Sequence, residues 1–125
     1  MIRRLAVVAV VTGFSGSCSL FTDPPEPCKN LSVRIIATSG PTPEISWDPK
    51  CGIGRLRISE DRIDGATLWS IGTTAGDLYP PVRYGQAPSH VVEVVPAQPL
   101  VPGTPFVSIY DREQRLIGQD KLQVR

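Results

Sequence analysis

The sequence predicts an all-β domain, a two-sheet antiparallel sandwich of about seven strands. Short apolar runs in which every second residue faces the same side recur along the chain. The 13 prolines and 11 glycines fall mostly between these runs, as turns between strands require. Because a single sheet of this length would leave one apolar face in water, two sheets must cover each other.

The first 17 residues are typical of a secretory signal peptide. Arg3 and Arg4 precede an unbroken apolar run, Leu5 to Val11, and small residues follow at positions 15–17. A membrane-spanning helix needs about 20 apolar residues, far more than this run supplies. We therefore expect an exported protein whose leader is not part of the folded domain.

The segment Ser15-Gly16-Ser17-Cys18 resembles the lipobox of bacterial lipoproteins, in which small residues precede a cysteine that is lipidated and becomes the mature N-terminus. It departs from that pattern at Ser15, where Leu or Val is usual. The resemblance implies that Cys18 is a lipid anchor in the bacterial cell envelope. The same small residues also permit ordinary cleavage after Ser17, which would give a soluble periplasmic or secreted protein.

Three cysteines occur in the chain, and their number fits a lipid anchor. An exported chain with three cysteines would keep one free thiol, whereas lipidation of Cys18 would leave Cys28 and Cys51 as a disulfide pair. Residues 18–27 are rich in proline, which favours an extended backbone with a reach of about 30 Å. This segment is expected to be either a tether or a plain N-terminal tail, and the folded domain is expected over residues 28–125.

The strands are expected one after another along this domain, each bounded by turn residues. In the first strand, Leu31, Val33 and Ile35 alternate with residues of the opposite face. In the third, Leu56 and Ile58 are expected to face inward. The strands after the first are expected in the runs 45–47, 54–59, 66–72, 90–95, 106–110 and 116–124.

The run from Leu100 to Ile109 resembles the L-x-P-G-T-x-Y-x-V-x-V signature that leads into strand F of fibronectin type III domains. Trp47 likewise sits where that family places a buried tryptophan on strand B. The resemblance implies that Trp47 and Phe106 point between the two sheets. It also implies that Cys28 and Cys51 lie at one pole of the sandwich, where they are close enough to pair.

Three features depart from the family pattern. Phe106 replaces the tyrosine whose hydroxyl bonds back to the chain at the corner before strand F. Pro96 and Pro99 fall where strand E is expected to continue. Residues 77–88 form a long connection that is expected to be irregular, so the strand assignment from residue 69 to residue 95 is open.

The charge balance of the chain argues against nucleic acid as a partner. Without the leader the chain carries 11 basic and 12 acidic residues, and it has no basic stripe. Nucleic-acid binding needs several clustered Lys or Arg residues. The composition therefore argues against a nucleic-acid partner.

The sequence does not predict a catalytic or metal-binding motif. His90 is the only histidine, and its neighbour Ser89 does not make a triad by adjacency, because triads are assembled in space. The acidic segment 59–64 lacks the spacing of a calcium-binding loop and is interpreted as a charged turn. We expect no cofactor, and we do not expect an enzyme.

Trp69, Tyr79 and Tyr84 lie in or beside the irregular connection and are a candidate ligand platform. Exposed aromatic rings stack on sugars or anchor protein partners. Core packing is the alternative interpretation for Trp69.

These features predict an exported, lipid-anchored protein of the bacterial cell envelope that acts as a non-catalytic binding or assembly module. Its partner would be an envelope protein or a glycan. A carbohydrate-binding module that uses exposed aromatics is one alternative. A small secreted hydrolase is another, with only Ser89 and His90 in its favour.

Overall fold

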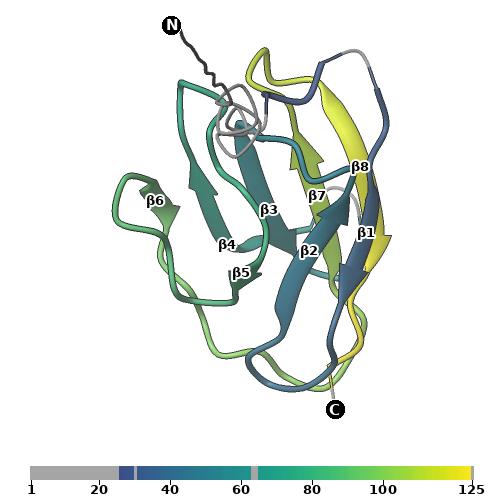
Figure 1. Ribbon diagram of the computed structural model, residues 1–125. Coiled ribbons are helices and arrows are strands. Elements are labelled where there is room, and N and C mark those ends of the chain that lie inside the picture. The colour runs from purple at the N-terminus through teal and green to yellow at the C-terminus, as the bar shows by residue number, and fades with distance from the viewer. Residues whose placement is uncertain (1–25, 30, 63–64, 125) are drawn as a thin grey trace, which may run out of the picture.

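The computed structural model describes residues 26–29, 31–62 and 65–124, which form two antiparallel β-sheets (Figure 1). The strands are β1 (Arg34–Ala37), β2 (Glu44–Asp48), β3 (Arg55–Ser59), β4 (Thr67–Gly72), β5 (Val82–Arg83), β6 (Val92–Val95), β7 (Phe106–Tyr110) and β8 (Leu116–Lys121). One sheet has the order β1-β2-β5 and the other the order β6-β4-β3-β7-β8. The predicted all-β sandwich is confirmed. In the described ranges, no helix is long and apolar enough to span a bilayer.

The core fills the space between the two sheets with alternate side chains of the strands. Trp47 of β2 is 0% exposed, and its Nε1 donates a hydrogen bond to the Cys51 carbonyl at 2.8 Å. Leu56 and Ile58 of β3 are also fully buried, as their alternation predicted. The other fully buried apolar residues of the strands are Ile45, Trp69, Ile71, Val107 and Ile109.

Phe106 lies on the outer side of the sandwich, so the prediction that it points into the core was wrong. Val107 and Ile109 of β7 are the fully buried residues, and side chains of a strand alternate between its faces. Phe106 is half-buried on the opposite face, with Lys121 Nζ 5.7 Å from its ring centre. The inward apolar pair of β7 is thus one residue out of step with the signature that Phe106 resembles, and such a shift reverses every side chain.

The connection between β4 and β7 contains one more strand than expected, which makes eight strands instead of about seven. β5 lies inside the segment 77–88 and pairs with β2. The predicted strand at 90–95 is β6, which pairs with β4 at the outer edge of the five-stranded sheet (Figure 1). β5 therefore completes the three-stranded sheet beside β2, and β6 has a neighbouring strand on one side only.

The opposite edge of the five-stranded sheet closes against β1. The amide of Val33 donates a hydrogen bond to the Ile117 carbonyl at 2.9 Å, which joins the two sheets there. A Cβ on Gly118 would lie 2.6 Å from Val33 Cγ2, so this close approach requires glycine. β8 and β1 consequently lie side by side in Figure 1, whereas β6 remains open.

Cys28 and Cys51 form a disulfide at one pole of the sandwich, as predicted. Their Cα atoms are 5.0 Å apart, within the range that the bond requires. Two backbone hydrogen bonds flank the disulfide: Cys28 donates to the Gly52 carbonyl at 2.7 Å, and Gly52 donates to the Glu26 carbonyl at 3.0 Å. The bridge therefore fixes the start of the domain to the β2–β3 loop.

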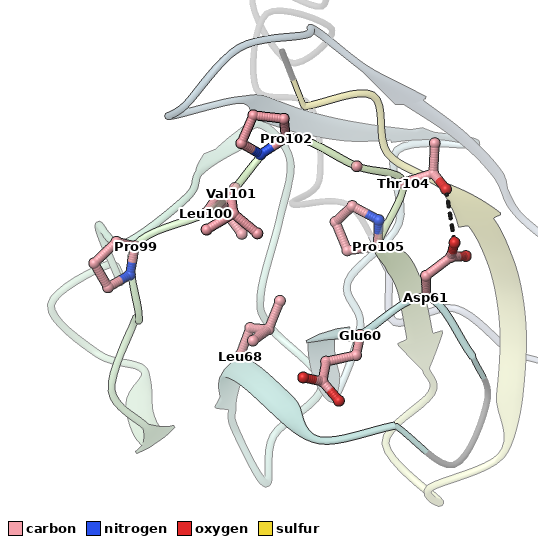
Figure 2. A pocket seen from close by; sticks show the side chains of 10 residues that line it. Glu60, Asp61, Leu68, Pro99, Leu100, Val101, Pro102, Thr104 and Pro105 are labelled. Carbon is pink, nitrogen blue, oxygen red and sulfur yellow. Dashed lines mark hydrogen bonds between the residues drawn. The ribbon is translucent and has the colours of Figure 1, made fainter.

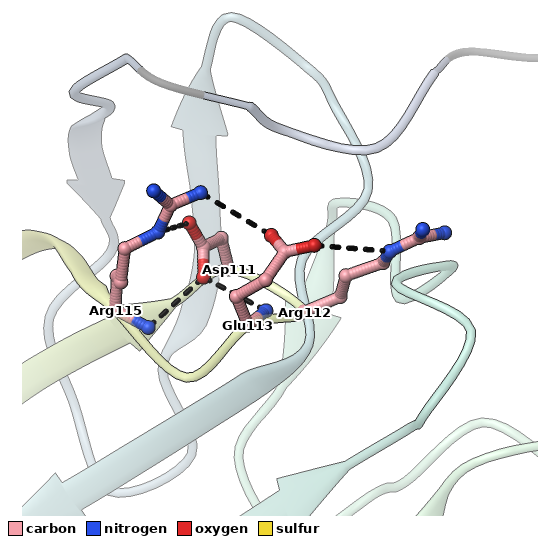
Figure 3. A network of polar contacts seen from close by, with 4 residues as sticks. All are labelled: Asp111, Arg112, Glu113 and Arg115. Carbon is pink, nitrogen blue, oxygen red and sulfur yellow. Dashed lines mark hydrogen bonds and ion pairs between the residues drawn. The ribbon is translucent and has the colours of Figure 1, made fainter.

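The β7–β8 hairpin is organised by the buried carboxylate of Asp111 (Figure 3). Its Oδ1 accepts hydrogen bonds from the amides of Glu113 and Arg115, and its Oδ2 accepts one from Arg115 Nε, all at 2.9 Å. These bonds hold a tight turn in which Gln114 has a φ of 67°, in the left-handed region. The turn is thereby fixed beside the end of the sheet that carries Tyr110.

Candidate functional site

Two of the three aromatics predicted as a ligand platform lie in the core. Trp69 is 0% exposed and Tyr84 is 5% exposed, and their ring centres are 5.1 Å apart. Tyr79 is half-buried at the disulfide pole, where its ring faces Gly52. The structure therefore does not form an exposed platform from these residues, and the core-packing interpretation of Trp69 is confirmed.

The polar atoms of the two buried aromatics bind the long β4–β7 connection to the sandwich. The Tyr84 hydroxyl donates to the Gln98 carbonyl at 2.6 Å, and Trp69 Nε1 donates to Glu93 Oε2 at 2.7 Å. Burial raises the pKa of the Tyr84 hydroxyl, so this group stays protonated and remains a donor. Both residues thus have a structural role.

The remaining candidates for chemistry that the structure describes form no hydrogen bond or ion pair with one another. His90 is exposed, and its Nε2 lies 3.0 Å from the Asp77 carbonyl oxygen. No hydrogen bond joins it to Ser89 within the described chain. Glu60 and Asp61 accept hydrogen bonds from Ala66 and Thr104, as a charged turn would.

Several predicted features fall on residues that the structure does not describe. The signal peptide at 1–17, Cys18, most of the tether at 18–27 and Asp64 of the acidic segment lie outside the described residues. Across the ranges that are described, no group of three His, Cys, Asp or Glu side chains could hold a metal ion.

The strand register brings polar, aromatic and basic side chains together on the outer side of the five-stranded sheet, where Ser70 and Ser108 are themselves fully buried. Arg55 lies opposite Tyr110, Arg57 lies opposite Ser108, and Phe106 lies opposite Lys121. We call this surface the outer sheet face and define it by eight residues: Arg55, Arg57, Ser70, Phe106, Ser108, Tyr110, Gln119 and Lys121. It contains three cations, of which Lys121 pairs with the Asp61 carboxylate at 4.0 Å.

Both arginines of the outer sheet face are held in place by neutral groups. Arg55 Nε donates to Ser70 Oγ at 3.1 Å, and its guanidinium carbon is 5.7 Å from the ring centre of Tyr110. Arg57 Nε donates to Thr67 Oγ1 at 2.7 Å, and Nη2 donates to the Gly65 carbonyl at 2.9 Å. Among the described residues, no carboxylate pairs with either arginine. Their positive charges are therefore fixed in position, and no carboxylate of the described residues neutralises them.

An open hollow of about 470 Å³ adjoins Arg55 at the β6 edge, and we call it the Arg55 hollow. Val92 and Val94, which are 65% and 58% exposed, supply an apolar wall. The other lining residues are Gly54, Arg55, Gly72, Thr73, Thr74, His90 and Gln114. Hydrogen-bonding groups and one fixed cation thus meet an apolar surface, a combination typical of ligand sites.

A second, smaller hollow of about 230 Å³ lies under the segment 99–105 (Figure 2). Leu68 lies on one side of it and Leu100 and Val101 on the other, while the hydrogen bond from Thr104 to Asp61 closes one end. Its lining is largely apolar, and its two carboxylates already accept hydrogen bonds from the chain. It offers room for one apolar group but few polar groups to orient a ligand.

The sequence contained part of the signal for the outer sheet face. The runs Arg-Leu-Arg at 55–57 and Phe-Val-Ser-Ile-Tyr at 106–110 place basic and aromatic residues on the face opposite the apolar ones. Only the pairing of β3 with β7 shows that these residues are neighbours.

No protein-family model, curated protein or solved structure matches this chain.

Proposed function

We propose that the protein is an exported, lipid-anchored component of the bacterial cell envelope and acts as a non-catalytic binding module through its outer sheet face. The observation that carries this proposal is the pair Arg55 and Arg57, which hydroxyl and carbonyl groups hold in place and which pair with no carboxylate in the described part of the chain. Ordering a long arginine side chain costs up to about 2 kcal/mol of conformational entropy. Side chains ordered in this way before a ligand arrives favour binding, because less freedom is lost in the complex.

The location rests on the Ser15-Gly16-Ser17-Cys18 segment and on the disulfide. Disulfides persist in oxidising compartments outside the cytoplasm, so the Cys28–Cys51 bridge fits an exported protein. We also assign the sandwich to the fibronectin type III-like group. The buried Trp47 supports this assignment, and the outward Phe106 and the β5–β6 arrangement make the domain a divergent one.

Replacing Cys18 with serine should release the protein from membranes washed with high salt, because serine cannot take the thioether-linked lipid and salt screens the charge-based contacts that remain. Fractionation and intact-mass measurement check this result, which should include the loss of acyl mass. Ser15→Leu, which restores the usual lipobox residue, is the control and should remain in the membrane. A wild-type mature protein that begins at Cys18 without added lipid would contradict the anchor.

The soluble Cys18→Ser chain provides the test of the binding surface. We expect it to sediment with isolated cell envelopes, and Arg55→Gln combined with Arg57→Gln should weaken this association by at least about tenfold, because charge-assisted contacts contribute about 1.5–3 kcal/mol each. Arg34→Gln, which removes an exposed charge from the other sheet, is the matched control and should bind normally. Equal binding by all three proteins would show that the outer sheet face is not the binding surface.

A further inference from the structure

The Arg55 hollow has the charge and the donors to bind a carboxylate. Arg55 Nε donates a hydrogen bond to Ser70 Oγ. In the described part of the chain, the two Nη groups of Arg55 donate no hydrogen bond. Two parallel N–H groups of a guanidinium match the two oxygens of a carboxylate. Thr74 and Gln114 add a hydroxyl and an amide to the same lining, which contains no acidic residue. The site is therefore complementary to an anion with a planar acid group.

A second cation extends this site along β3. Arg57 is two residues from Arg55 on the same face, about 7 Å away along the strand. Gln119 lies in the same row as Arg57, and its amide donates a hydrogen bond to the buried Ser108 hydroxyl at 3.0 Å. Gln119 is exposed, so it is the polar group of this row that a ligand can reach. A ligand that carries acid groups at intervals along a chain would meet both arginines.

The groups around the two arginines favour a sugar polymer over an acidic peptide. Peptide partners are usually anchored by large side chains in deep, desolvated pockets, and the outer sheet face and the Arg55 hollow are open. Sugar rings instead combine an apolar C–H face with many hydroxyls. The exposed Val92 and Val94 suit the first, and hydroxyl and amide groups suit the second.

We infer that the ligand of the outer sheet face is an acidic polysaccharide of the uronic-acid type. Its carboxylates pair with Arg55 and Arg57, and one sugar ring packs against Val92 and Val94 in the Arg55 hollow. This inference rests on the proposed binding function, whose surface it shares.

Titration calorimetry with oligomers of polygalacturonate tests the inference on the Cys18→Ser chain. We expect binding that is lost with the fully methyl-esterified oligomer, since the ester removes the charge and keeps the sugar rings. Arg55→Gln combined with Arg57→Gln should weaken binding by at least about tenfold, and Arg34→Gln should leave it unchanged. Val94→Ser should also weaken binding without a loss of charge. Thermal unfolding of each variant shows whether it is folded.

Three outcomes would overturn the inference. Failure of the wild-type chain to bind the acidic oligomer, while envelope binding still depends on the two arginines, would reject the polysaccharide and leave the binding function standing. Equal binding of poly-glutamate would identify an acidic peptide as the ligand class. Unchanged envelope binding after replacement of both arginines would reject the proposed function together with the inference.

Discussion

Replacing Trp47 with alanine is expected to lower the free energy of unfolding by about 3–5 kcal/mol. The ring is fully buried between the sheets, so its removal loses apolar burial and leaves a cavity. It also removes the donor to the Cys51 carbonyl, which ties β2 to the disulfide loop. Urea denaturation of the soluble Cys18→Ser chain, followed by circular dichroism, measures the change.

Phe106→Ala is the matched control, because it removes an aromatic ring from the outer side of β7. The ring is half-buried and lies under Lys121, so we expect a loss below about 1 kcal/mol. Similar losses for the Trp47 and Phe106 variants would mean that Phe106 faces the core. The register of β7, with Val107 and Ile109 inward, would then be wrong.

Reducing the Cys28–Cys51 disulfide is expected to lower the free energy of unfolding by about 2–4 kcal/mol. The two cysteines are 23 positions apart, and breaking the bond frees that loop in the unfolded chain. Because a small domain has a total stability of about 5–15 kcal/mol, this loss would shift the denaturation midpoint clearly.

Denaturation with and without reductant measures the contribution of the disulfide. A chain carrying both Cys28→Ser and Cys51→Ser is the control, and its curve should not respond to reductant. An unchanged curve for the cysteine-containing chain would show that the bridge contributes little to stability.

The sequence alone determined the local structure of the domain and much of its core. Alternation predicted strands close to β2, β3, β4, β7 and β8, because a period of two is a property of each strand by itself. It also placed Leu56 and Ile58 inside. The cysteine count predicted the pairing of Cys28 with Cys51 on the premise that Cys18 carries a lipid, and the pair is present in the structure.

Local sequence patterns gave wrong predictions where the burial of a side chain depends on a strand that is distant in the sequence. Trp69 and Tyr84 were candidates for a surface platform, but both are buried and pack against each other, although Trp69 lies on β4 and Tyr84 directly follows β5. The two-residue β5 is too short to leave a period in the sequence, and its pairing with β2 is a contact across more than 30 positions of the chain. Phe106 was misplaced for a related reason, because a resemblance gives the kind of strand but not its register.

For the candidate site, too, the sequence predicts the face of each strand, and the pairing of the strands decides which residues meet. Alternation determined that Arg55 and Arg57 share a face of β3 and that Phe106 and Tyr110 share a face of β7. Only the tertiary structure decided that these faces coincide, that Ser70 and Thr67 hold the arginines, and that β6 adds an apolar wall. The physical reason is that side-chain direction is set within each strand, whereas neighbours are set by hydrogen bonding between strands distant in sequence.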